Sequence, residues 1–430
     1  MDALSPTFDG LFFMNRIFTY LAISLIILNY FGCKEEDIIS VSFDGYELIP
    51  DTNPLNSAMK TEINGIYNVL EGKDRFGEKV VVKWSGDTLS LFTGKNYANF
   101  ILRGGYQDSA VIFEGEWKYA FEEQIYLARL FIRYDEGGKE IINGIDSLSE
   151  IIFRGHTGTN PNNLTSPFAF ELERQVDFSE SDFAILAHRG GSSSNKCIPE
   201  AENSLSMIRL AEKYGANGIE IDIRLSKDKV PILFHDDNFT ERVIDGQFFI
   251  GPVSNYTYSH IQSFCKLKNG ETIPTLREAL DVVLHETKLN IVWLDIKSAE
   301  AIHKLMPIQL EYLKKAESMG RKLEILMGLA MDETVNAYLS NTNHGVSPAI
   351  CELDFALVRK TDAQVWAPRW TLGPLVSEID EMHRENRKVY IWTVDKPEAL
   401  NIFMSDLKAD GILTNYPNMV AYEYYTKYQK

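Results

Sequence analysis

Residues 218–224 read GIEIDIR, an apolar strand candidate in which isoleucines flank Glu220 and Asp222. Residues two apart in a strand face the same side of a sheet, so we expect both carboxyl groups on one face. From Asp182 onward, similar apolar runs alternate with amphipathic helical patterns. This alternation favours a parallel sheet covered by helices. The segment 182–430 has the usual length of an eight-stranded α/β barrel, roughly 250 residues.

The number of strand candidates in this C-terminal segment also fits a TIM-type (β/α)8 barrel. Eight candidates are found, at 183–187, 218–224, 290–296, 323–329, 349–354, 363–367, 389–394 and 411–414. Helical patterns lie between them at 204–214, 276–285, 299–319, 334–340, 375–385 and 397–406. We therefore predict an α/β fold in which residues 182–430 form the barrel.

One further apolar run, Val230–His235, does not belong to the barrel count. It follows the second strand after five residues, whereas a parallel crossover needs about a dozen or more. We therefore expect an antiparallel hairpin. A turn centred near residues 227–228 would place Asp222 opposite Leu233 and Glu220 opposite His235.

The preceding part of the chain, residues 59–178, has a different pattern. Short runs rich in β-branched and aromatic residues occur at 79–84, 88–92, 111–113, 126–134 and 150–154. Glycine-containing turn signals such as Gly104-Gly105 separate them. Such spacing predicts a mostly antiparallel β domain, either a sandwich or a barrel. It carries no catalytic signature, and it could bind a ligand or hold the barrel away from a membrane.

The amino terminus has the features of an export signal. Arg16 precedes an uncharged apolar run, Ile17–Phe31, which Gly32-Cys33 closes. A basic start, a short apolar segment and a small residue before the cut are typical of a secretory signal. We predict a signal peptide with a lipobox at 1–33, lipidation of Cys33 and a tether at 34–58. The protein would then be exported and lipid-anchored to a bacterial membrane, on the periplasmic or cell-surface side.

An uncleaved membrane anchor or a buried hairpin is the alternative interpretation of this terminus. It fits less well, because a helix over the apolar run would rise about 22 Å, whereas the hydrocarbon core is about 30 Å thick.

Composition excludes several classes of protein. A hydrophobic content of 45% is too high for a disordered chain. A net charge of −18 repels polyanions, so we expect no nucleic-acid partner. Four cysteines in 430 residues cannot form a disulfide framework. The chain also lacks the sequence motifs of nucleotide-binding loops, serine hydrolases and zinc proteases.

Chemically useful side chains end several strand candidates of the barrel. His188-Arg189 follows the first strand, His235 ends the hairpin, and Asp295 and Lys297 lie two apart on the next strand. In such barrels, polar residues at the carboxyl ends of strands form the active site. Together with the first carboxylate pair, Asp295 makes an oxygen donor set that suits Ca²⁺ or Mg²⁺. Two histidines can divide acid and base work, while Arg189 and Lys297 can bind phosphate. The pattern predicts metal-assisted phosphoryl chemistry.

Several sequence blocks in this half resemble glycerophosphodiester phosphodiesterases. They are AHRG at 187–190, ENS at 202–204, GIEID at 218–222, PILFHD at 231–236, IPTL at 273–276, WTVD at 392–395 and DGILTN at 410–415. The resemblance covers about residues 183–420 and none of the N-terminal β domain. It implies a phospholipase-C-like barrel that hydrolyses glycerophosphodiesters to glycerol 3-phosphate and an alcohol.

The resemblance also implies roles for individual residues. His188 and His235 match the acid/base pair of the family, without indicating which is the acid. Glu220 and Asp222 match two metal ligands, and Asp295 stands where the third ligand, usually a glutamate, is expected. The shorter aspartate is a departure from the family's pattern and could alter the preference for the metal.

Other residues match substrate-binding positions. Arg189 and Lys297 match phosphate contacts, and Glu202 matches a glutamate that lies in the family's site. A lengthened block leaves Glu200 as a competitor for that role, and Glu202 is preferred because it directly precedes the asparagine. Trp392 could line the site or fill the top of the barrel.

Two other functions remain open at this point. The chain could be a phospholipase-like enzyme acting on intact lipids or polyol-phosphate polymers, or a binding protein whose barrel has lost activity. The expected partners are a small-molecule substrate and, through the lipid anchor, a membrane.

Overall fold

The computed structural model describes residues 41–144, 150–178, 181–191, 198, 200–246 and 249–429. The predicted signal peptide, the lipobox and Cys33 lie outside the described residues. Along the described part of the chain, no helix is both long enough and apolar enough to span a bilayer.

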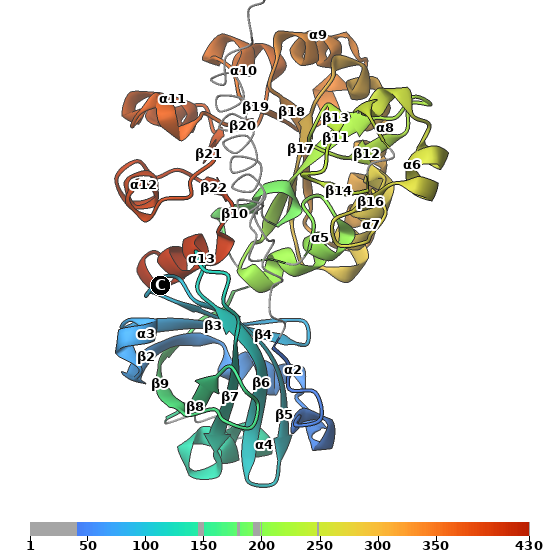
Figure 1. Cartoon of the computed structure of the whole chain (residues 1–430). Coiled ribbons are helices and arrows are strands. Elements are labelled where there is room, and N and C mark those ends of the chain that lie inside the picture. The colour runs from blue at the N-terminus through green and yellow to red at the C-terminus, as the bar shows by residue number, and fades with distance from the viewer. Residues whose placement is uncertain are drawn as a thin grey trace, which may run out of the picture. The chain divides into compact units, whose positions relative to one another are not determined.

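The N-terminal β domain is a closed antiparallel barrel, one of the two predicted forms (Figure 1). Each strand pairs with its neighbours in chain order, and the last pairs with the first. The strands are β2 (Gly65–Glu71), β3 (Lys79–Ser85), β4 (Thr88–Thr93), β5 (Asn99–Gln107), β6 (Ala110–Lys118), β7 (Tyr126–Arg133), β8 (Ile152–Gly158) and β9 (Ser166–Gln175). Closure satisfies the backbone hydrogen bonds of both edges.

Gly104-Gly105, expected to form a turn, lies inside β5 instead. A Cβ atom at Gly104 would come within 2.6 Å of the Phe113 ring, and one at Gly105 would overlap Thr52. These glycines therefore make room for neighbouring side chains rather than reverse the chain.

Aromatic side chains fill the interior of this barrel. The Phe76 ring lies 5.3 Å from that of Phe100, 5.1 Å from that of Trp117 and 5.4 Å from that of Phe168. Phe76 comes from the short helix α3 (Lys73–Phe76), and all four side chains are buried. An eight-stranded barrel is just wide enough for such side chains, so this interior is a packed core.

Part of the segment predicted as a tether contacts the β barrel. Strand β1 (Asn53–Pro54) pairs with β5, and the backbone N–H of Leu48 donates to Glu114 Oε2 at 2.7 Å. Helix α2 (Ser57–Ile63) follows directly. Residues 48–58 are thus held against the β domain by backbone and side-chain hydrogen bonds.

The C-terminal half is a closed barrel of eight parallel strands, as predicted (Figure 1). Its strands are β10 (Ala184–Ala187), β11 (Gly218–Leu225), β17 (Ile291–Ile296), β18 (Glu324–Leu329), β19 (Ala349–Cys351), β20 (Val365–Trp366), β21 (Lys388–Ile391) and β22 (Gly411–Thr414). All eight predicted strands are confirmed, although several are shorter than the sequence pattern indicated.

Helices follow the barrel strands. They are α5 (Leu205–Ala211), α7 (Leu276–Glu286), α8 (Ala299–Ser318), α9 (Asp332–Ser340), α10 (Phe355–Thr361), α11 (Val376–Arg384), α12 (Pro397–Asn401) and α13 (Pro417–Lys427). Helix α10 was not predicted from the sequence. Asp354 caps it by accepting a hydrogen bond from the backbone of Leu357.

The predicted hairpin forms, but its register is shifted by one residue. Strand β12 (Pro231–Leu233) pairs with β11 so that Leu233 lies opposite Ile223, not Asp222. Lys229 adopts a left-handed conformation with φ of 64°, and its N–H donates to Ser226 O. This turn is centred on Asp228, which explains the shift.

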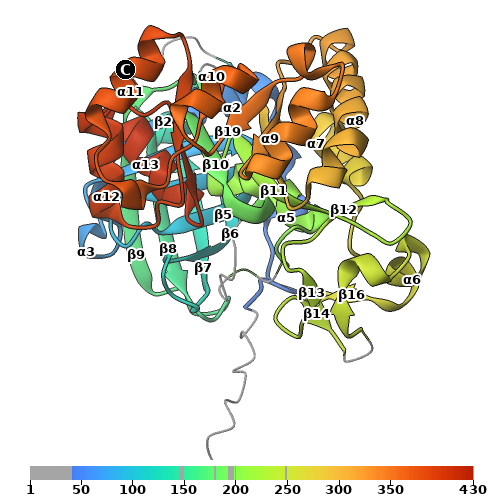
Figure 2. The same cartoon turned by 90° about the horizontal axis from the view of Figure 1, so that it is seen from above.

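After the hairpin the chain forms a small insertion with its own apolar core, visible beside the barrel helices in Figure 2. It contains β13 (Asn238–Phe239), β14 (Ile244–Asp245), β15 (Gly251–Pro252), α6 (Tyr258–Phe264) and β16 (Lys266–Leu267). None of these elements was predicted. The insertion matters because its first loop approaches the barrel mouth.

Candidate functional site

The alternation of side chains along the strands determines which residues reach the mouth of the C-terminal barrel. One buried cluster fills its interior and includes Leu186, Trp293, Ile350, Ala367, Tyr390 and Leu413. Two residues further along each strand come His188, Asp295, Glu352, Arg369, Trp392 and Asn415. On β11 the same face carries Gly218, Glu220 and Asp222. Polar side chains therefore follow the apolar layer at the carboxyl ends of the strands.

Three carboxylates converge at this mouth. Asp222 on β11 is directly paired with Asp295 on β17, and Glu220 lies one pleat earlier. One oxygen from each of the three lies within 4.8 Å of the others. Glu220 and Asp222 are only 2% and 1% exposed. The residues predicted as metal ligands are thus brought together.

The electrostatics of Glu220 fit a cation site. Burial, and then the charges of Asp222 and Asp295, raise the pKa of the Glu220 carboxyl well above its usual value. Its Oε2 accepts a hydrogen bond from the Arg189 backbone at 2.8 Å, while its buried Oε1 has no hydrogen-bond partner among the described residues. Three crowded carboxylates with an orphaned oxygen form a donor set that suits Ca²⁺ or Mg²⁺.

Lys297 supplies positive charge to two of these carboxylates. Its Nζ lies 2.7 Å from Asp222 Oδ1 and 2.6 Å from Asp295 Oδ2. Burial alone would raise the pKa of Asp222, but the charges of Lys297 and His235 and the hydrogen bonds from Lys297 and Asn203 outweigh it and lower that pKa. Asp222 is therefore held as a carboxylate beside Glu220.

The orientation of His188 follows from its neighbours. Asn415 Nδ2 donates to Asp395 Oδ2 at 2.7 Å, so Asn415 Oδ1 is the atom that faces His188 Nδ1, at 2.9 Å. Because that oxygen can only accept, Nδ1 carries the proton and Nε2 keeps its lone pair. Nε2 lies 3.8 Å from Glu220 Oε2. Burial, and then the charge of Arg189, lower the pKa of His188 below its usual value.

His235 has a carboxylate partner instead of an amide. Its Nδ1 lies 2.8 Å from Asp236 Oδ1, and its backbone oxygen accepts from Arg224 Nε at 2.9 Å. Although burial raises the pKa of Asp236, hydrogen bonds from Arg242 and His235 lower it to about 2. Asp236 is therefore an acceptor that fixes the His235 ring with Nδ1–H toward it.

Arg189 is held in place by carboxylates. It has a left-handed φ of 53°, and its Nη1 lies 2.9 Å from Glu202 Oε1. Both oxygens of Glu202 bind Arg189 and Arg242. In this structure Glu202 therefore orients guanidinium groups. The competing Glu200 has Glu116, Glu271 and Lys118 as its charged neighbours, not the groups of the barrel mouth.

Trp392 follows β21 and packs, partly buried, against the apolar cluster inside the barrel. Its Nε1–H donates to Ala367 O at 2.7 Å, and the Arg369 guanidinium lies 4.6 Å from the centre of its ring. Glu352 was not predicted as a site residue. It has Asp295, Lys297 and Arg369 as charged neighbours, and burial followed by the charge of Asp295 raises its pKa to about 8. The alternation along β19 from Ile350 is the signal that could have identified it.

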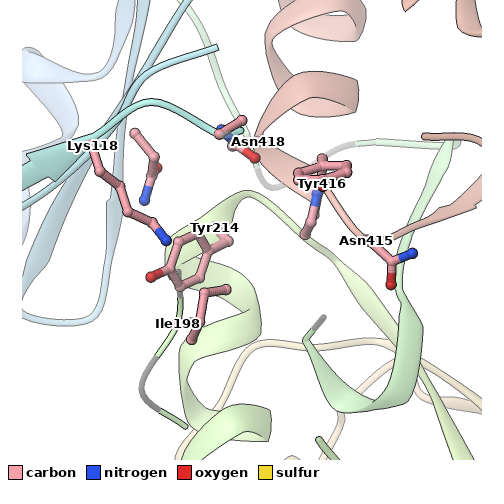
Figure 3. Close-up of a pocket in the computed structure, with 9 residues that line it drawn as sticks. Lys118, Ile198, Tyr214, Asn415, Tyr416 and Asn418 are labelled. Atoms are coloured by element: carbon pink, nitrogen blue, oxygen red, sulfur yellow. The ribbon is translucent and has the colours of Figure 1, made fainter. Parts of the chain in front are cut away.

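A small cavity lies next to this site (Figure 3). Its lining includes Asn99 and Lys118 from the β domain, Tyr214, and the segment 415–418 after β22. Its volume of about 10 Å³ matches one water molecule. The cavity is therefore too small to be a substrate pocket, although Asn415, which borders it, also binds His188.

Comparisons with known proteins agree on one family. The glycerophosphodiester phosphodiesterase of Caldanaerobacter subterraneus subsp. tengcongensis is 26% identical over 54% of this chain and 94% of its own length. Human glycerophosphodiester phosphodiesterase 1 is 35% identical over 28% of this chain, and the match spans 38% of the human protein.

Solved structures that are similar to this chain include a glycerophosphodiester phosphodiesterase from Parabacteroides distasonis. It is 19% identical, with a TM-score of 0.45, and the match covers 57% of this chain and 98% of that one. An Oleispira antarctica phosphodiesterase in complex with its product sn-glycerol-3-phosphate is 20% identical, with a TM-score of 0.45 over 55% of this chain and 96% of that one.

The sequence profile of the glycerophosphoryl diester phosphodiesterase family matches residues 188–419. This range begins at His188, includes every residue assigned to the barrel mouth and covers more than half of the chain. The chain therefore belongs to the glycerophosphoryl diester phosphodiesterase family.

Proposed function

We propose that this protein hydrolyses glycerophosphodiesters to glycerol 3-phosphate and an alcohol, with the help of a divalent cation. The observation that carries this proposal is the convergence of three carboxylates, two imidazoles, Arg189 and Lys297 at one barrel mouth, where His188 lies beside Glu220 and His235 is a charged neighbour of Asp222. Membership of the family and relatives of that name support the same reaction.

Glu220, Asp222 and Asp295 are the proposed ligands of Ca²⁺ or Mg²⁺. Such an ion, when bound, would polarise a phosphoryl oxygen and balance the negative charge that develops during the reaction. Arg189 and Lys297 are the proposed contacts of the phosphate, through their N–H groups. Trp392 and the Arg369 guanidinium that lies over its ring are proposed to contact the rest of the substrate.

The two histidines have different surroundings, and these suggest how the work is divided. His188 keeps its Nε2 lone pair because Asn415 accepts the Nδ1 proton, so His188 is the proposed base that takes a proton from the attacking water or glycerol hydroxyl. His235, oriented by Asp236, is the proposed acid. The attacking oxygen forms a bond to phosphorus, the bond to the alkoxide breaks, and the alkoxide takes the proton from His235.

The lowered pKa of His188 predicts the pH dependence of the reaction. A base must be unprotonated to accept a proton. His188 Nε2 is unprotonated when the pH exceeds the pKa of His188, and that pKa lies below the ordinary value of 6.5. In a profile of kcat/KM against pH, we expect the midpoint of the acidic limb below pH 6.5. A midpoint above 6.5 would contradict the assignment of His188 as the base.

Export and lipid anchoring are a separate proposal, supported by the sequence from Arg16 to Cys33. Expression with radiolabelled palmitate in a Gram-negative host tests it. We expect label in the wild-type chain and none in Cys33→Ala, and label that persists in this variant would contradict lipidation at Cys33.

The proposed reaction is tested by measuring glycerol 3-phosphate released from glycerophosphocholine. We expect release that requires Ca²⁺ or Mg²⁺ and stops when a chelator is added. Lysophosphatidylcholine keeps its acyl chain when its phosphodiester bond is cleaved, so the product to measure on both substrates is choline. Comparing the two rates of choline release discriminates the phospholipase-like alternative, which predicts the faster rate on the lipid. No release from either substrate with the metal present would favour an inactive binding barrel.

A further inference from the structure

We propose that Arg242 is a positioning residue that connects the two ends of the reaction site. This inference rests on the proposed function and goes beyond it. One guanidinium group holds Asp236 against His235 and also holds Glu202 against Arg189. The proposed acid and a phosphate-binding arginine would then be kept in register by a side chain of the insertion.

The contacts of Arg242 occupy two edges of its guanidinium. Nη1 and Nη2 each lie 2.8 Å from an oxygen of Glu202. Nη2 also lies 2.8 Å from Asp236 Oδ1, and Nε lies 3.1 Å from Asp236 Oδ2. A planar fork of N–H groups suits two such paired contacts, and the single ammonium of a lysine cannot reproduce them.

Next to His235, the proposed acid, the contacts of Arg242 restrain Asp236. Asp236 Oδ1 is shared between Arg242 and His235 Nδ1, while Thr240 donates to Asp236 Oδ2 at 3.2 Å. Without the guanidinium, Asp236 loses both of the contacts that Arg242 makes with it, and it can rotate away from the ring. The direction of His235 Nε2 toward the leaving group would then be less well defined.

Next to Arg189, the proposed phosphate contact, Glu202 is bound by both Arg242 and Arg189. It is buried, with its side chain 6% exposed, and it binds Arg189 Nη1 at 2.9 and 3.0 Å. A buried carboxylate between two guanidinium groups is well compensated, and removal of one of them would leave Glu202 free to pull Arg189 out of place.

The insertion gives Arg242 a rigid base. The next two residues, Val243 and Ile244, are 4% and 2% exposed in the insertion core, and their backbone N–H groups bond to Thr240 O. The side chain of Arg242 itself is 38% exposed, so a simple surface ion pair would contribute little. Its contribution is the geometry that it imposes on the buried Glu202 and the partly buried Asp236.

Arg242→Ala and Arg242→Lys test the proposal on the full chain, with glycerophosphocholine as the substrate. We expect kcat/KM to fall by about 10- to 100-fold in both variants, as is usual when a supporting partner of a site is removed. Millimolar guanidinium ion should restore part of the activity of Arg242→Ala and none of that of Arg242→Lys, in which the ammonium occupies the space.

Arg277→Ala is the matched control. Arg277 makes a similar paired contact with Glu311, at 2.9 and 2.7 Å, between the outer helices α7 and α8. We expect this variant to keep wild-type kcat/KM and to show no effect of guanidinium.

The possible results distinguish a failure of the proposed function from a failure of the role proposed for Arg242. If the wild-type chain releases no glycerol 3-phosphate, the proposed function fails. If it does, and Arg242→Ala keeps wild-type kcat/KM or shows a loss that guanidinium does not restore, the role of Arg242 is wrong and the proposed function stands.

Discussion

His188→Ala is expected to lower kcat for glycerophosphocholine by about 10³-fold, within the range usual for a lost acid or base. Asn415 holds the His188 ring with its Nε2 lone pair directed away from the amide. An alanine leaves no group to take the proton, so KM should change much less than kcat. Initial rates of glycerol 3-phosphate release measure this effect.

His303→Ala is the control for that experiment. His303 lies on the outer helix α8, where its ring nitrogen contacts Asn341 at 3.4 Å. We expect this variant to keep wild-type kcat. A His188→Ala variant that keeps more than about a tenth of the wild-type kcat would show that His188 is not the base.

Glu220→Gln is expected to have an effect of similar size for a different reason. The change removes one charge from the proposed ligand set, and the transition-state stabilisation that a bound cation supplies amounts to several kcal/mol. A loss of about 10³-fold in kcat/KM follows, since each 1.36 kcal/mol corresponds to about tenfold.

The same variant should become more stable in the absence of metal. The raised pKa of Glu220 means that the folded chain holds a proton at pH values where the unfolded chain has released it. The stability of the metal-free fold therefore decreases as the pH rises above the ordinary carboxyl range, and a glutamine avoids that cost.

Thermal unfolding with and without Ca²⁺ measures this difference. In chelator at neutral pH, we expect a higher Tm for Glu220→Gln than for the wild-type chain. Ca²⁺ should raise the Tm of the wild-type chain, because an ion that binds the folded state stabilises it, and should not raise that of the variant. Glu324→Gln, at the amino end of β18, is the control and should respond to Ca²⁺ like the wild type. Equal responses of Glu220→Gln and the wild type would contradict the ligand assignment.

The C-terminal barrel could be predicted because its signal is local. Each strand is a short apolar run, and its polar residues follow at the carboxyl end, as Asp295 and Lys297 follow Trp293 on β17. The N-terminal barrel was harder to predict, since β5 contains Gly104-Gly105, a pair that resembles a turn in the sequence. In the structure these glycines leave space for the side chains of Phe113 and Thr52. The hairpin register was missed by one residue, because the left-handed Lys229 has no local sequence signal.

The candidate site, like the fold, could be predicted only in part. The residues predicted from strand ends meet at one mouth, while their roles in catalysis and metal binding remain predictions. Two supporting residues, Arg242 and Asn415, were not assigned a role from the sequence, because they come from elsewhere in the chain. Arg242 belongs to an insertion whose short strands have no clear alternation, and Asn415 contacts His188 across 227 positions of sequence. Such pairings depend on closure of the barrel.

A Mn²⁺-soaked crystal, measured at the manganese absorption edge, shows whether the three carboxylates share one cation. We expect one strong anomalous peak that touches an oxygen of each of Glu220, Asp222 and Asp295, with the His188 and His235 rings on either side of it. A soaked crystal with no peak there, or with its peak on other ligands, would contradict a shared metal site at the barrel mouth.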